Sequence, residues 1–345
     1  MKKILLLWII CLGMIAQVEA QVKTALQPLD LFDMEYVTEP SISPDGSKVV
    51  YVRNFKDIMT DRDYSNLWIV NSDGSQNRPI TQGNQRDYAP VWSHDGTKLA
   101  FLSNQQDDKT KLFVHYFDTQ TSVALTNSAV PPGSVSWSYD NQSLAFTQFV
   151  PSTPKSLLNI PSKPTGADWN AAPIYIDEMV YRRDGAGYVK PGNRQIFTIG
   201  LAGGTARQWT SDDHNYGSPV WSKDGKSLFF SANLRENAEF EPANSEIYQL
   251  NLTDGSIKAL TNRFGPDSGP VLSPDGKKIA YTGNNDTFQG YQVTHLYVMN
   301  TDGSGVKNLT EDLDRDASNP QWDANGVWRY QSGLCSPDRQ SKNHS

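Results

Sequence analysis

One short motif recurs along this chain, and it constrains the fold more than any other feature. A brief apolar segment leads into a turn of the form Ser-x-Asp-Gly, and a β-favouring run follows the turn. The clearest copies are PSISPDGSKVVYVRN (40–54), PVWSHDGTKLAFLSN (90–104), SPVWSKDGKSLFFSAN (218–233) and PVLSPDGKKIAYTG (270–283), with degenerate copies beginning at 135 and 319. An internal repeat of this kind indicates that one supersecondary unit is used several times.

The turn residues of the motif predict a hairpin. Aspartate hydrogen-bonds to nearby backbone, and glycine supplies the positive φ that tight turns need. The repeat-turn residues are Asp45, Gly46, Asp95, Gly96, Asp224, Gly225, Asp275 and Gly276. Further hairpins closed by Asp-Gly follow at 67–81, 247–261 and 296–310. Each repeat therefore contains four strands.

The spacing of the repeats predicts the architecture. From Asp45 through Asp95, Asp140 and Asp224 to Asp275, the turn aspartates are 50, 45, 84 and 51 residues apart. Repeats of about 40–50 residues with four strands each are typical of β-propeller blades. We therefore predict an all-β chain, a β-propeller of four-stranded blades with five recognisable blades and an incomplete sixth. The large residue before each turn is expected in the core: Ile42, Trp92, Trp137, Trp221, Leu272 and Trp322.

The long step after Asp140 marks an irregular third blade. Its first hairpin covers 135–149, and its outer strands are expected only at 195–210. The residues between are rich in proline, which disfavours helices and central strands, so they are expected to form an irregular insertion at the rim. The alternative is a separate short blade without the usual turn.

The two ends of the chain differ from the repeats. Residues 1–20 have the basic start, short apolar run and small final residues of a secretory signal peptide, with cleavage expected after Ala20. We expect a propeller over 21–326 and an irregular or disordered tail over 327–345, where the sixth repeat breaks off as in a truncated chain. The signal predicts a periplasmic or secreted protein with no membrane span after cleavage. The net charge of −7 argues against nucleic acid as a partner.

Residues 181–233 also carry a resemblance to a known family. The strings YRRDGAGY, GGTARQWT and YGSPVWSKDGKSLFFSAN resemble the propeller of the acylaminoacyl-peptidase and dipeptidyl-peptidase branch of the prolyl oligopeptidase family. The resemblance covers 29–326, and the Asp-Gly hairpins alone are also similar to those of the periplasmic protein TolB. It implies a C-terminal α/β-hydrolase domain with Ser, Asp and His as catalytic residues. It also implies that the propeller restricts entry to short or unstructured peptides.

The catalytic machinery of that family has no counterpart in this sequence. A nucleophile elbow requires Gly-x-Ser-x-Gly, and the pentapeptide does not occur. The one Gly-Ser-Gly, at 303–305, lies in a predicted hairpin turn. We therefore assign no catalytic residue and expect the chain to be inactive alone, with the hydrolase domain absent. We also predict no metal site and no cofactor, because the histidines are scattered without metal-ligand spacing.

The insertion contains the one cluster that the repeat does not explain, Arg182, Arg183 and Asp184. Loops displayed on a rigid scaffold often carry recognition, and arginine binds carboxylates through paired hydrogen bonds. We predict that this cluster binds a peptide substrate; the alternative is a surface salt bridge that fixes the insertion. Two functions remain open. The chain is the gating portion of an exported serine peptidase, or it is a stand-alone TolB-like propeller that binds a protein partner.

Overall fold

The computed structural model describes residues 25–106, 108–153, 161–170, 174–323 and 328–332, and this part of the chain is almost entirely β-structure. It contains five four-stranded antiparallel sheets, two two-stranded pairs and one short 3-10 helix, η1 (Pro28–Phe32). No helix of the described residues is long and apolar enough to cross a membrane.

The strands follow the order that the repeats predict. The first sheet contains β1 (Tyr36–Ile42), β2 (Lys48–Asp57), β3 (Arg62–Asn71) and β4 (Arg78–Pro79). The second contains β5 (Asp87–Trp92), β6 (Lys98–Ser103), β7 (Lys111–Tyr116) and β8 (Thr121–Ala124). The third contains β9 (Pro132–Trp137), β10 (Ser143–Pro151), β13 (Gly192–Gly200) and β14 (Arg207–Gln208).

The remaining sheets continue the same pattern. The fourth contains β15 (Val220–Trp221), β16 (Ser227–Ala232), β17 (Glu246–Asn251) and β18 (Ile257–Ala259). The fifth contains β19 (Asp267–Leu272), β20 (Lys278–Gly283), β21 (His295–Asn300) and β22 (Lys307–Asn308). The sixth pairs β23 (Ala317–Trp322) with β24 (Trp328–Ser332), and a separate small hairpin pairs β11 (Arg182–Arg183) with β12 (Gly187–Tyr188).

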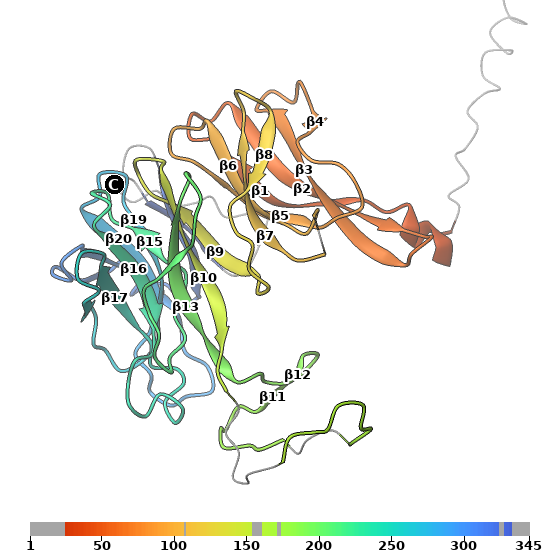
Figure 1. The fold of residues 1–345 in the computed structure, drawn as a ribbon. Coiled ribbons are helices and arrows are strands. Elements are labelled where there is room, and N and C mark those ends of the chain that lie inside the picture. The colour runs from red at the N-terminus through yellow and green to blue at the C-terminus, as the bar shows by residue number, and fades with distance from the viewer. Residues whose placement is uncertain (1–24, 107, 154–160, 171–173, 324–327, 333–345) are drawn as a thin grey trace, which may run out of the picture.

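The sheets stand side by side in chain order, as blades of a β-propeller do (Figure 1). Five apolar clusters fill the spaces between consecutive sheets. In the first of them, Val50 and Leu67 of the first sheet pack against Trp92 and Phe101 of the second. The core therefore lies between sheets rather than within one sheet, which is why each blade depends on its neighbours.

Where the large residue before a turn is tryptophan, it ties its sheet to the preceding one. The indole N–H of Trp92 donates to the Ser41 carbonyl at 3.0 Å, and that of Trp137 donates to the Val91 carbonyl at 2.9 Å. The same bond recurs from Trp221 to Ser136 at 3.3 Å and from Trp322 to Val271 at 3.0 Å. The core position predicted for these residues is confirmed for Trp92, Trp137, Trp221 and Leu272, which are buried. It is wrong for Ile42, which is 67% exposed because no sheet precedes it among the described residues.

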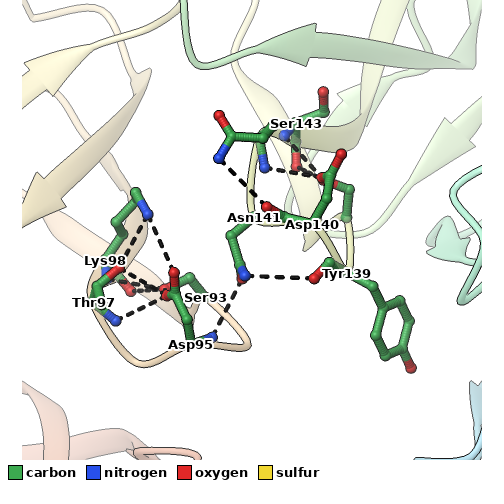
Figure 2. A network of polar contacts seen from close by, with 10 residues as sticks. Ser93, Asp95, Thr97, Lys98, Tyr139, Asp140, Asn141 and Ser143 are labelled. Carbon is green, nitrogen blue, oxygen red and sulfur yellow. Dashed lines mark hydrogen bonds and ion pairs between the residues drawn. The ribbon is translucent and has the colours of Figure 1, made fainter.

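The turns have the predicted chemistry, shown for the second and third sheets in Figure 2. The Asp95 carboxylate accepts hydrogen bonds from the Ser93 hydroxyl at 2.6 Å and the Thr97 N–H at 3.0 Å. Asn141 of the next turn accepts from the Asp95 N–H at 3.3 Å, which joins the two sheets. The turn glycines have φ between 68° and 75°: Gly46, Gly96, Gly225 and Gly276.

Hydrogen bonding lowers the pKa of these turn aspartates. At Asp95, burial raises the pKa, but hydrogen bonds from Ser93 and Thr97 outweigh it and leave the pKa at about 2. Hydrogen bonds from the Ser hydroxyl and the following N–H lower the pKa of the others, Asp45, Asp140, Asp224 and Asp275. The ionised carboxylates therefore belong to the folded form of the first five repeats, whose turns the structure describes.

The structure supports one third blade with an insertion rather than a separate blade. β10 pairs with β13 over its whole length, from Ser143 opposite Gly200 to Pro151 opposite Gly192. The outer strands of this sheet are therefore delayed in the sequence by the insertion between 151 and 192.

The structure tests only part of what was predicted for the two ends of the chain. The signal peptide lies outside the described residues, and so do residues 333–345. The prediction of an irregular tail is wrong for 328–332, where β24 pairs with β23 and sets Trp328 opposite Trp322. The segment WRYQS alternates aromatic and polar residues, the period of a strand, and pairing with β23 satisfies its backbone. The lead-in before the first sheet forms η1, after which β1 begins at Tyr36.

Candidate functional site

The antiparallel order of the strands gives the propeller two different ends. The connection between the first and second strands and that between the third and fourth meet at one end, where the Asp-Gly turns lie. The connections between the second and third strands lie at the opposite end, together with those from one sheet to the next. We call the second of these the loop end. It carries exposed large side chains on several sheets, among them Met59 (86% exposed), Phe240 (72%) and Phe288 (83%).

The insertion belongs to the loop end, because it joins the second and third strands of the third sheet. Its base is closed by the paired residues Pro151 and Gly192 and by a hydrogen bond of 3.1 Å from the Ser152 N–H to the Pro191 carbonyl. Gly192 has φ of +134°, and a Cβ there would lie 2.4 Å from the Val150 carbonyl oxygen. Only glycine fits where the two long strands leave the sheet. Figure 1 shows the insertion (green, at the lower right) extending away from the sheets.

The predicted cluster lies at the tip of the small hairpin β11–β12. Arg182 pairs with Tyr188 and Arg183 with Gly187, and the Ala186 N–H donates to the Arg183 carbonyl at 3.2 Å. All three predicted residues are exposed, and among the described residues no ion pair holds either arginine. The alternative of a salt bridge that fixes the insertion therefore finds no support in the described structure.

A small hollow lies beside this hairpin. Its volume is about 110 Å³, and the segment before β11 and the segment after β12 form its walls. Three tyrosines line it, Tyr175 (42% exposed), Tyr181 (46%) and Tyr188 (54%). Asp177 and Glu178 line it as well. The wall is thus aromatic with acidic groups beside it, a few residues from the two arginines.

The hollow could not be predicted from the repeat, because its walls come from segments that meet only in the folded insertion. The string IYIDEMVY (174–181) was the available signal, since it concentrates aromatic and branched residues within a proline-rich stretch. The Met179 N–H also donates to the Glu239 carboxylate, which belongs to the loop between β16 and β17. The insertion is thereby connected to the fourth sheet.

The described residues contain no group of three or more His, Cys, Asp or Glu side chains arranged to hold a metal ion. What this arrangement offers chemically is recognition: exposed guanidinium groups, an aromatic hollow and carboxylates at the rim.

The chain is similar in sequence to bacterial peptidases. No family model matches the chain. An uncharacterised peptidase of Bacillus subtilis, YuxL, is 29% identical over 207 residues, which cover 60% of this chain and 31% of that protein. Dipeptidyl-peptidase 5 of Porphyromonas gingivalis is 25% identical over 327 residues, covering 88% of this chain and 46% of that protein. The chain thus spans between about a third and a half of the length of these relatives.

A shorter match extends to TolB. The Tol-Pal system protein TolB of Francisella tularensis is 31% identical over 99 residues, which cover 28% of this chain and 20% of that protein. The chain therefore matches peptidases over a longer stretch of sequence than it matches the TolB protein.

Solved structures show the same fold. Acylaminoacyl peptidase of Pyrococcus horikoshii superposes with a TM-score of 0.67 at 18% identity, covering 87% of this chain and 43% of that one. The β-propeller domain of the Trilobed protease of Pyrococcus furiosus superposes with a TM-score of 0.58 at 16% identity, covering 87% and 79%. The predicted resemblance to the propeller of these peptidases, with TolB-like repeats, is confirmed.

Proposed function

We propose that this chain is the propeller portion of an exported peptidase of the prolyl oligopeptidase family, in which the loop end admits short peptides to a hydrolase domain. One observation carries the proposal. The insertion, the segment outside the repeat, places two exposed arginines beside an aromatic hollow at the loop end. The sequence similarity to dipeptidyl-peptidase 5 over 88% of the chain supports a peptide as the ligand.

The chemistry of the insertion suits a peptide. A guanidinium group binds a carboxylate through two parallel hydrogen bonds, and an aromatic hollow accepts a side chain of the same peptide. Arg182 and Arg183 have no competing ion pair among the described residues. The position of the insertion supports a gating role, because it projects from the end of the propeller at which the sheets are joined to one another.

A stand-alone TolB-like propeller that binds a protein partner is the second candidate. The identity of 31% to a TolB protein over 99 residues favours it. Reading the coding DNA beyond the codon for Ser345 in all three frames separates the two candidates. A Gly-x-Ser-x-Gly in an α/β-hydrolase pattern supports the peptidase, and its absence from every frame supports the stand-alone propeller.

The direct test is a calorimetric titration of the chain with short peptides. The Arg182→Ala/Arg183→Ala double variant is expected to bind a peptide with a free C-terminal carboxylate about 10- to 100-fold more weakly, because hydrogen bonds to a charged group are lost. The C-terminally amidated peptide is expected to bind weakly to both proteins.

Arg62→Ala provides the matched control. Arg62 is an exposed arginine beside the connection between β2 and β3, also at the loop end but outside the insertion. We expect its substitution to leave peptide affinity unchanged. Equal affinity of the double variant and the unaltered chain for the free carboxylate would contradict the proposed role of the two arginines.

A further inference from the structure

A cavity of about 380 Å³ lies between the fourth and fifth sheets, at the end of the propeller where the Asp-Gly turns lie. β16, β17 and β18 of the fourth sheet form one wall, and the turns of the fifth sheet form the other. Small-molecule sites commonly enclose about 300–1,000 Å³, so this cavity is large enough for a ligand. It lies at the opposite end from the insertion, and what it binds does not depend on the proposed function.

Two residues of the fourth sheet make the lining of this cavity polar. Ser227, the first residue of β16, is short where three other sheets have a lysine, and the corresponding residues are Lys48, Lys98, Ser143 and Lys278. Gln249 lies opposite Phe229, where the other four sheets have a β-branched residue: Ile69, Val114, Thr198 and Val298. The Gln249 amide donates to the hydroxyl of the buried Ser227 at 3.0 Å. An amide and a hydroxyl therefore lie where packing of the sheets alone would favour apolar side chains.

Two exposed lysines of the fourth sheet reach across the rim of the cavity to the fifth sheet. The Lys223 ammonium donates to the Pro274 carbonyl at 2.7 Å, and that of Lys258 donates to the Asp302 carbonyl at 3.3 Å. The stem of Lys223 lies so close to Gly276 that a Cβ there would be 2.6 Å from the Lys223 Cβ. Among the described residues no ion pair holds either lysine. Because an ammonium group has three N–H donors, both lysines keep donors for a ligand.

The carboxylates in the lining are occupied by their own turns. Asp224 accepts hydrogen bonds from the Ser222 hydroxyl at 2.6 Å and the Lys226 N–H at 3.0 Å, and Asp302 accepts from the Ser304 N–H at 2.8 Å. Hydrogen bonds from serine and from the backbone lower the pKa of both carboxyl groups. The lysine donors are therefore the charged groups that a ligand can engage, and an oxyanion is the group that matches them.

We propose that this cavity binds an acidic sugar. Its carboxylate or phosphate group lies between Lys223 and Lys258, and its hydroxyl groups contact Gln249 and Ser227. A sugar hydroxyl both donates and accepts hydrogen bonds, as do the Gln249 amide and the Ser227 hydroxyl. A ligand with an oxyanion and several hydroxyl groups therefore satisfies the rim and the polar lining together.

Calorimetric titration of the chain with glucuronate, glucose-6-phosphate and glucose tests the proposal, because the three ligands share one ring and differ in charge. At least one of the two acids is expected to bind about 10-fold or more tightly than glucose, and comparing them tells whether the site prefers carboxylate or phosphate. The Lys223→Met/Lys258→Met double variant is expected to bind that acid about 10- to 100-fold more weakly, because hydrogen bonds to a charged group are lost. Gln249→Val, which introduces the residue type of positions 114 and 298, is expected to weaken binding as well.

Lys307→Met is the matched control. Lys307 is the exposed residue of the fifth sheet that corresponds to Lys258, and it lies outside the lining, so its substitution is expected to leave affinity unchanged. The proposal is overturned if neither acid binds, if glucose binds as tightly as both acids, or if the double variant keeps full affinity. Inorganic phosphate that binds as tightly as the sugar phosphate would reduce the cavity to an adventitious anion site only and would also overturn it.

Discussion

The third sheet and the insertion that it carries are adjacent in sequence and opposite in character. Phe146 of β10 is fully buried, stacks on Phe197 at 5.7 Å and has a counterpart in the neighbouring sheets. Tyr188 of the insertion is 54% exposed and has no counterpart in the repeat. A side chain that recurs in every repeat maintains the propeller, and one that occurs once is free to serve recognition. The comparison predicts that stability and binding can be changed separately.

The largest expected effect is on the core of the third sheet. Phe146→Ala is expected to lower the free energy of unfolding by about 3–5 kcal/mol, because it leaves a cavity between the second and third sheets. Tyr188→Ala is the control in the insertion and is expected to change stability by less than about 0.5 kcal/mol. Urea unfolding followed by circular dichroism measures both. Equal losses in the two variants would remove the distinction between the regions.

The turns allow the third sheet and the insertion to be compared through a smaller expected loss of stability. The Asp140 carboxylate accepts hydrogen bonds from the Ser138 hydroxyl at 2.5 Å and the Gln142 N–H at 3.0 Å, and Ser138 is buried. Asp140→Ala is expected to destabilise the fold by about 1–3 kcal/mol, because the buried Ser138 hydroxyl and the Gln142 N–H lose their acceptor. Asp184→Ala, in the turn of the exposed hairpin, is expected to cost less than about 0.5 kcal/mol in the same urea experiment. A larger loss at Asp184 would show that the hairpin is part of the stable scaffold.

A smaller effect is expected from acid. The turn aspartates have pKa values below those of the unfolded chain, so their stabilisation is present above the unfolded pKa of about 4 and is lost as the pH falls towards the folded values. The urea midpoint is therefore expected to fall between about pH 4 and pH 2. Asp140→Asn, which removes one titrating group, is expected to reduce this dependence. An identical pH profile for the variant would argue against the turns as its source.

The sequence predicted the parts of the fold that depend on local chemistry. Asp95 and Gly96 identify a turn wherever they occur, so the hairpins, the four-stranded sheets and the position of the insertion were all predictable. The exposure of Ile42 could not be predicted from the sequence. Ile42 occupies the same position in its repeat as the buried Trp92, but no sheet precedes it among the described residues. β24 was missed because a strand with few aliphatic residues is defined by pairing with β23 rather than by its own composition.

The candidate site was predicted only at its tip. Arg182 and Arg183 could be selected because they interrupt the repeat, and the structure places them on an exposed hairpin. The hollow beside them depends on the approach of 174–178 to 188–191, a non-local contact within a segment of irregular structure. No local pattern of residues specifies such an approach. The sequence therefore could not predict that Tyr175 and Tyr188 line the same hollow.

Removing the insertion separates peptide recognition from the stability of the propeller in one experiment. Pro151 and Gly192 are opposite each other in the paired strands β10 and β13, so a short Asn-Gly turn can replace residues 152–191. We expect this variant to unfold at the same urea midpoint as the unaltered chain and to bind short peptides no longer in the calorimetric titration. Loss of the cooperative unfolding transition, or peptide binding of unchanged affinity, would show that the insertion is not a recognition element separate from the scaffold.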